Sequence, residues 1–371
     1  MKKLVVVLFF ALTGGLFAQQ WNFSGLVNGG LGILMLEDED DSAFGLIARN
    51  QQGNGIRAQL DAIGTNKDGN AGIVMRLRAV GGGSNTFRDD FQFRRAYGWV
   101  SFMDNLLRVQ GGRMQGNDFD TLDPITDGDT LFDNYGVLTY INPTDSVKIS
   151  VGAFTPQRLG EGLNIDAVAG YAGFSVNLPD LLNLRAQLSS QKDDVKALAS
   201  ARISAVKGIP IELTARLTDL SNFSDTGTIS FFEHVGYNAI DNLSFNLAAA
   251  QSISQAEDTD IYFRAWLWLT YAMGDIIPRL DFNYVTGGKF RHDMGLGVNS
   301  PFKDGYEANP FTYDKNNAFF TVSPSIQFRA AANTFVDLGY IFAKDMGDAP
   351  AFGTKDKGTN HAACIDVRVS F

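Results

Sequence analysis

The chain has 371 residues, of which 45% are hydrophobic and 19% charged, and its formal net charge is −10. This apolar and aromatic content excludes a disordered chain, and an acidic chain without a Lys/Arg cluster offers no surface for nucleic acid. A single cysteine, Cys364, excludes a disulfide framework and a cysteine-based zinc site, and three scattered histidines form no metal motif. No cofactor is therefore expected.

The N-terminus has the three-part layout of a secretory signal peptide. Met1-Lys2-Lys3 is a short positive region, residues 4–17 are mainly apolar, and Ala18 followed by glutamine offers a cleavage point. Residues 1–18 are predicted to be removed on export, which leaves 19–371 as the mature chain. Beyond residue 18 no run of about 18 apolar residues occurs, which excludes a helical membrane protein.

Apolar and polar residues alternate with period two along most of the mature chain, which predicts β-strands. Segments with this alternation start near residues 21, 56, 71, 182, 211, 243 and 363. One face of each strand is apolar and the other carries Arg, Asn, Gln, Ser and Asp. The alternation alone fits a soluble β-sandwich, which buries the apolar face, and a membrane barrel, which turns that face to lipid.

Three features favour the membrane barrel: the export signal, about 16–18 strands without a linker, and connections that alternate in length. The short turns are 65–69, 103–105, 143–145, 178–180, 207–210, 241–242, 274–275 and 332–333. The long connections are 35–53, 81–90, 115–134, 155–163, 220–227, 252–259, 287–316 and 344–360. The sequence thus predicts an all-β fold, a single transmembrane antiparallel up-and-down β-barrel with short periplasmic turns and long extracellular loops.

The last eight residues, 364–371, have apolar residues at every second place and end on Phe371. This segment resembles the C-terminal assembly signal of bacterial outer-membrane β-barrels. The resemblance implies the outer membrane as location, its lipids as surroundings, and the barrel-assembly machinery as a partner through Phe371.

Residues 95–102 followed by 106–113 resemble the strand–turn–strand that precedes the constriction loop of general bacterial porins. In those porins an inward-folded loop follows the fifth strand, and here that place is taken by the Asp-rich segment 115–134. The resemblance implies passive diffusion of ions and small hydrophilic solutes through a water-filled pore, and a homotrimer.

The candidate pore-lining residues are five arginines on the polar strand faces and six aspartates of the candidate constriction loop. They are Arg57, Arg76, Arg78, Arg95, Arg108, Asp118, Asp120, Asp123, Asp127, Asp129 and Asp133. Arg94 and Arg113 have the opposite parity and are placed near the outer rim. Carboxylates facing arginines across a pore would set up a transverse field that selects solutes by charge.

Other interpretations stay open at this point. The acidic loop also fits a solvated surface loop or a calcium site, and the barrel also fits a surface adhesin or a purely structural protein. No enzymatic activity is expected. His234 is the only histidine within a strand that has a nearby carboxylate, and Glu233 is adjacent to it, so the two side chains point to opposite faces.

Overall fold

The computed structural model describes residues 20–36, 42–47, 57–80, 90–115, 118–122, 130–155, 167–191, 194–254, 261–286, 318–346 and 359–371. The predicted signal peptide, residues 1–18, lies outside the described residues. No helix in these ranges has the length and apolar character needed to cross a membrane.

The described residues contain 19 β-strands in one sheet. The first ten are β1 (Gln20–Leu36), β2 (Ser42–Ile47), β3 (Arg57–Thr65), β4 (Ala71–Val80), β5 (Asp90–Phe102), β6 (Leu107–Gln115), β7 (Asp133–Thr144), β8 (Val147–Thr155), β9 (Ala169–Leu178) and β10 (Leu182–Gln191). The others are β11 (Asp194–Ile203), β12 (Ile211–Thr218), β13 (Thr228–Tyr237), β14 (Leu243–Ser254), β15 (Ile261–Tyr271), β16 (Ile276–Thr286), β17 (Ala318–Ala331), β18 (Thr334–Asp345) and β19 (Thr359–Ser370). A 3₁₀ turn, η2 (Leu220–Asn222), and a short helix, α2 (Phe223–Thr226), lie between β12 and β13.

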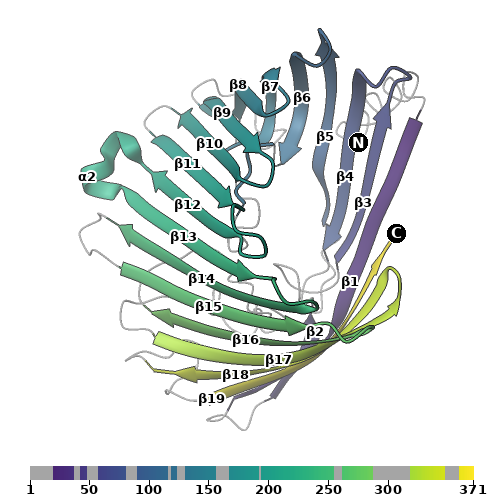
Figure 1. Ribbon diagram of the computed structural model, residues 1–371, viewed down its shortest axis with the longest axis vertical. Helices are drawn as coiled ribbons and strands as arrows, with labels where there is room; N and C mark the ends of the chain where they lie inside the picture. The colour runs from purple at the N-terminus through teal and green to yellow at the C-terminus, as the bar shows by residue number, and fades with distance from the viewer. Residues whose placement is uncertain are drawn as a thin grey trace.

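The sheet is an up-and-down meander that closes on itself (Figure 1). From β3 onward each strand pairs antiparallel with the next along the chain, and β19 pairs antiparallel with β1. The result is a closed antiparallel barrel of 18 strand positions, as the sequence predicts.

The difference between 19 strands and 18 positions arises at β1. β2 pairs with β1 from Gly30 to Met35, and β3 pairs with the same edge of β1 from Gln20 to Asn28. β2 and β3 are therefore two pieces of one barrel strand. The expectation that residues 35–53 form only a long loop was wrong, because 42–47 pair with the end of β1 instead.

The two barrel faces have opposite chemistry. Large apolar side chains such as Val151, Leu213 and Leu247 are 51%, 44% and 47% exposed on the outer face. Their strand neighbours Ser150 and Thr214 point inward and are buried. The structure thus resolves the ambiguity of the alternation in favour of a barrel with an apolar exterior and a polar interior, because a sandwich would bury the apolar side chains.

The two rims differ in connection length, as predicted. All eight predicted short turns lie at one rim, which also holds the start of β1 and the end of β19, since Gln20 pairs with Thr65 beside the first short turn. At the opposite rim the connection between Gln191 and Asp194 spans two residues, which is shorter than the other connections there and was not foreseen.

The seam between the first and last strands depends on Gly25. Its backbone N–H donates to the Phe371 carbonyl over 2.9 Å, and the Phe371 N–H donates to the Gly25 carbonyl over 3.0 Å. A Cβ at position 25 would lie 2.5 Å from the Phe371 ring and 2.5 Å from the carbonyl oxygen of Gln59. Glycine therefore lets the terminal ring pack directly on β1.

We expect Gly25→Ala to destabilise the barrel by about 1–3 kcal/mol, the usual cost of overpacking, because the Gln59 carbonyl belongs to the backbone of β3 and cannot move aside. The measurement is the temperature at which the folded barrel converts to the unfolded form on a gel. Gly98→Ala is the matched control, since a Cβ there would meet only ordinary contacts of 3.7 Å or more. Equal transition temperatures for the two variants would contradict the role of Gly25.

Candidate functional site

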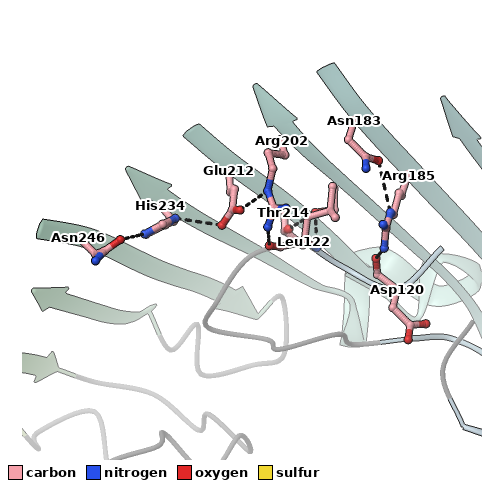
Figure 2. A network of polar contacts seen from close by, with 10 residues as sticks. Asp120, Leu122, Asn183, Arg185, Arg202, Glu212, Thr214, His234 and Asn246 are labelled. Atoms are coloured by element: carbon pink, nitrogen blue, oxygen red, sulfur yellow. Dashed lines mark hydrogen bonds and ion pairs between the residues drawn. The ribbon is translucent and has the colours of Figure 1, made fainter. Parts of the chain in front are cut away.

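Between β6 and β7 the chain turns into the barrel and lies on its inner wall. Residues 118–122 and 130–132, called here the outgoing arm and the returning arm, are the described parts of this inward segment. On the outgoing arm the Asp120 carbonyl accepts a hydrogen bond of 2.8 Å from Arg185 Nη1. The Leu122 carbonyl accepts one of 3.1 Å from Arg202 Nη2 (Figure 2). Segment 115–134 therefore folds inward over its described parts.

Two further contacts hold the outgoing arm against β10 and β11. The Phe119 carbonyl accepts a hydrogen bond from Gln187 Nε2 over 2.6 Å, and the Leu122 N–H donates to Ser200 Oγ over 3.0 Å. Asp118 forms an ion pair with Lys148 of β8, with 2.5 Å between Oδ2 and Nζ. The arm therefore spans the inner face from β8 to β11.

Apolar side chains fill the space between the inward segment and the wall. This inner cluster consists of Met114, Phe119, Leu131, Phe132, Leu138, Tyr140, Phe154, Ala169, Tyr171 and Leu198. The ring centroid of Phe132 lies 4.8 Å from that of Phe154 and 5.2 Å from that of Tyr171. Gly173 makes room for Phe119, because a Cβ there would lie 2.7 Å from its ring. The inner cluster is thus a small hydrophobic core inside the barrel.

The predicted arginine wall lies on the inner face of β4 to β6. Arg76 Nε lies 2.5 Å from Asp61 Oδ1 on β3, and Arg108 stacks over the Trp99 ring at 4.5 Å. Arg95 is the cross-strand partner of Arg76, and a bulge between β4 and β5 takes up the neighbouring residue 94.

Two more arginines, Arg78 and Arg113, have different surroundings. Arg78 Nη2 donates to Gln59 Oε1 over 3.1 Å. Arg113, placed near the outer rim from its parity, pairs in the register with Tyr135 and stacks over the Tyr135 ring at 5.5 Å. Tyr135 is two residues from Val137, which is 53% exposed on the outer face.

The predicted acidic residues are described only in part. Asp118 and Asp120 lie on the outgoing arm, and in Figure 2 the Asp120 carboxylate points away from Arg185. Asp123, Asp127 and Asp129 lie outside the described residues. The backbones of Arg57 and Asp133 lie in β3 and β7, and their side chains are not described.

The outgoing arm lies on a different part of the wall from the one that the sequence analysis named. Its described polar contacts are with β8, β10 and β11, whereas the predicted arginines lie on β3 to β6. Tyr140 of the inner cluster links the two, because its ring stacks on Phe119 of the outgoing arm at 5.8 Å and lies 5.9 Å from the Arg108 guanidinium. The arm and the arginines therefore meet around Tyr140.

A row of hydrogen-bonded polar side chains continues from the outgoing arm across β11 to β14 (Figure 2). Arg202 Nε donates to Glu212 Oε1 over 2.5 Å, and Glu212 Oε2 lies 2.9 Å from His234 Nδ1. His234 Nε2 lies 3.0 Å from Asn246 Oδ1. His234 thus has a carboxylate partner on the neighbouring strand, and it is Glu212 rather than Glu233.

The hydrogen bonds of His234 are relevant to whether this histidine could serve as a catalytic base. A hydrolase mechanism of the Ser–His type needs a ring nitrogen directed at a nucleophile. Among the described residues, both ring nitrogens of His234 lie against Glu212 and Asn246, and neither contacts a hydroxyl or thiol group. The described residues also hold no group of three His, Cys, Asp or Glu side chains that could bind a metal ion.

Sequence reasoning missed the residues that hold the inward segment: Lys148, Arg185, Gln187, Ser200 and Arg202. All five lie at inward-facing strand positions, so the alternation places them on the polar face. Nothing in the alternation indicates which inward residues meet a loop that is distant in sequence. The apolar inward residues Met114, Leu138 and Phe154 were the available signal, because they interrupt a polar face where the segment lands.

We expect Phe132→Ala to destabilise the folded barrel by about 3–5 kcal/mol, because Phe132 is fully buried in the inner cluster and its removal leaves a cavity. Phe174→Ala is the matched control, since Phe174 is 38% exposed on the outer face, where acyl chains can fill the space. Denaturant unfolding in lipid measures both. A cost at position 132 no larger than at 174 would show that the cluster does not stabilise the inward segment.

Comparison with known proteins supports the architecture. No family model matches the chain, and no curated protein matches it. Among solved structures, Pseudomonas aeruginosa OccK11 aligns with a TM-score of 0.55 at 9% identity, covering 96% of this chain and 97% of its own. OccD3 of the same organism gives 0.55 at 10% identity, covering 96% and 92%, and OprD gives 0.53 at 12%, covering 96% of each. These neighbours are outer-membrane porins, and the chain has their closed β-barrel fold.

Proposed function

We propose that the protein is an outer-membrane diffusion channel that passes ions and small hydrophilic solutes through a water-filled pore. The observation that carries this proposal is the inward segment, because a structural barrel has no need of a loop anchored to its own inner wall. Arg185, Arg202 and Gln187 commit buried or half-buried polar groups to that anchoring.

Barrel size supports a hollow interior. Eight strands are just filled by side chains, whereas porins of 16–18 strands leave an aqueous channel. This barrel has 18 strand positions, and its inward face carries polar side chains in most of its strands. Water is the medium that solvates those groups, and the inward segment with its inner cluster narrows the space that remains.

Charge on the narrowed part of the pore would select among solutes. Asp118 and Asp120 lie on the outgoing arm, and Arg76, Arg95 and Arg108 lie on the wall beside it. Two unit charges about 10 Å apart interact by roughly 0.4 kcal/mol in water and roughly 1.7 kcal/mol at an effective dielectric constant of 20. Several such charges would separate the paths of anions and cations, and transport would be passive.

The apolar outer face supports contact with outer-membrane lipids, and Phe371 at the seam supports recognition by the barrel-assembly machinery. The homotrimer implied by the porin resemblance stays a prediction, as does the adhesin or purely structural alternative. Bilayer recordings distinguish a channel from these alternatives, because only a channel conducts.

We expect the purified protein to conduct in planar bilayers, and Asp118→Asn with Asp120→Asn to shift its ion selectivity toward anions. Each lost charge is worth roughly 0.4 kcal/mol at about 10 Å in water, which corresponds to about a twofold change in permeability ratio. The reversal potential in a salt gradient is the measurement. Asp145→Asn, at an exposed short turn, is the control and should leave it unchanged. An unaltered reversal potential in the double variant would exclude these carboxylates from the selective region.

A further inference from the structure

One side chain joins the two arms of the inward segment. Gln187 Nε2 donates to the Phe119 carbonyl on the outgoing arm over 2.6 Å. Gln187 Oε1 accepts from the backbone N–H of Leu131 on the returning arm over 2.9 Å and from Thr130 Oγ1 over 3.1 Å. A single amide group thus bonds to backbone atoms of both arms.

The surroundings of Gln187 fix the orientation of its amide. The side chain is 4% exposed, and Tyr171 of the inner cluster donates its hydroxyl to Gln187 Oε1 over 3.2 Å. The three donors, from Thr130, Leu131 and Tyr171, therefore bond to Gln187 Oε1, and the Phe119 carbonyl accepts from Gln187 Nε2. A flipped amide would place its NH₂ group against the Leu131 N–H, so only one orientation satisfies both arms.

The other described wall residues that hold the inward segment by hydrogen bonds contact one arm and not both. Arg185, Arg202 and Ser200 bond only to the outgoing arm among the described contacts. If Gln187 were removed, the outgoing arm would keep these anchors, whereas the Leu131 N–H would lose its acceptor inside a packed region. An unmade buried hydrogen bond costs more than a made one contributes. Gln187 therefore controls the spacing between the arms.

We propose that Gln187 is a positioning residue that sets the aperture of the channel by clamping the two arms of the inward segment together. This inference rests on the proposed channel function for its consequence, since the aperture matters only if solutes pass. The clamp itself is a property of the folded chain and can be tested without conduction.

The test compares Gln187→Met, Gln187→Glu and the control Ser189→Ala by hydrogen exchange and single-channel recording. Methionine keeps the length and removes both hydrogen-bonding functions. Glutamate keeps the acceptor for Leu131 and replaces the donor to Phe119 with a second oxygen. Ser189 is buried on the same face of β10, two residues away. Heat-dependent mobility on a gel verifies that each variant forms a barrel.

With Gln187→Met, we expect the Leu131 amide to exchange on the order of tenfold faster, the effect of losing about one hydrogen bond's stabilisation, whereas the Leu122 amide keeps its bond to Ser200 Oγ and its slow exchange. With Gln187→Glu, the Leu131 amide should stay as slow as in the native protein, because its acceptor is kept. In recordings, Gln187→Met should lose the single conductance level of the native channel and open to larger, fluctuating levels.

The outcomes distinguish failure of the Gln187 clamp from failure of the proposed channel function. Exchange in Gln187→Met as slow as in Ser189→Ala overturns the clamp, whatever the conductance. Fast exchange with an unchanged conductance level shows that the arms do not set the aperture and overturns the proposal as well. Fast exchange in a protein whose native form does not conduct refutes the channel function and leaves the clamp standing.

Discussion

Closure of the sheet between β1 and β19 is the constraint on which the rest of the structure depends. Strand edges carry unpaired N–H and C=O groups, and a hydrocarbon environment offers them no partner. Eleven consecutive residue pairs join the two strands, and the reciprocal hydrogen bonds of Gly25 and Phe371 extend the pairing to the last residue. Because the number of strand positions is even, the chain starts and ends at the same rim.

Once the sheet is closed, every strand has an inside and an outside. The outside is mainly apolar over the described strands, with exceptions such as Arg113 and the Glu233–Gln251 pair, so most of the specific chemistry lies on the inward residues. The inner cluster is an exception to the polar interior, because its inward-facing side chains are mainly apolar. Met114, Leu138 and Phe154 are apolar where the inward segment packs, while the wall beyond the cluster is polar, from Arg202 to Asn246.

Much of this fold follows from the sequence because alternation and turn residues are local signals. The strands, the eight short turns and the terminal Phe371 all depend on residues close together in the chain. β2 escaped prediction because its six residues follow an acidic run and pair back on the end of β1, from Met35 with Ser42 to Gly30 with Ile47.

The site was harder to predict because its contacts join residues about 60 to 80 positions apart, such as Arg185 with Asp120 and Arg202 with Leu122. The parity rule placed the arginines on the inner face, and the acidic segment was recognised from its place after the fifth predicted strand. The partner of His234 was missed for a related reason. Glu233 is its neighbour in sequence, whereas the register between β12 and β13 brings Glu212 opposite it.

The barrel strand that β2 and β3 form together is interrupted between Ile47 and Arg57. Two successive inward positions of β1, Asn28 and Gly30, pair with Arg57 and Ile47, so ten residues of chain pass while β1 advances by two. Each piece takes its alignment from β1 independently of the other. Lengthening or shortening the chain between Ile47 and Arg57 therefore leaves both alignments intact, which makes this point a natural place to graft a foreign peptide without disturbing the cylinder.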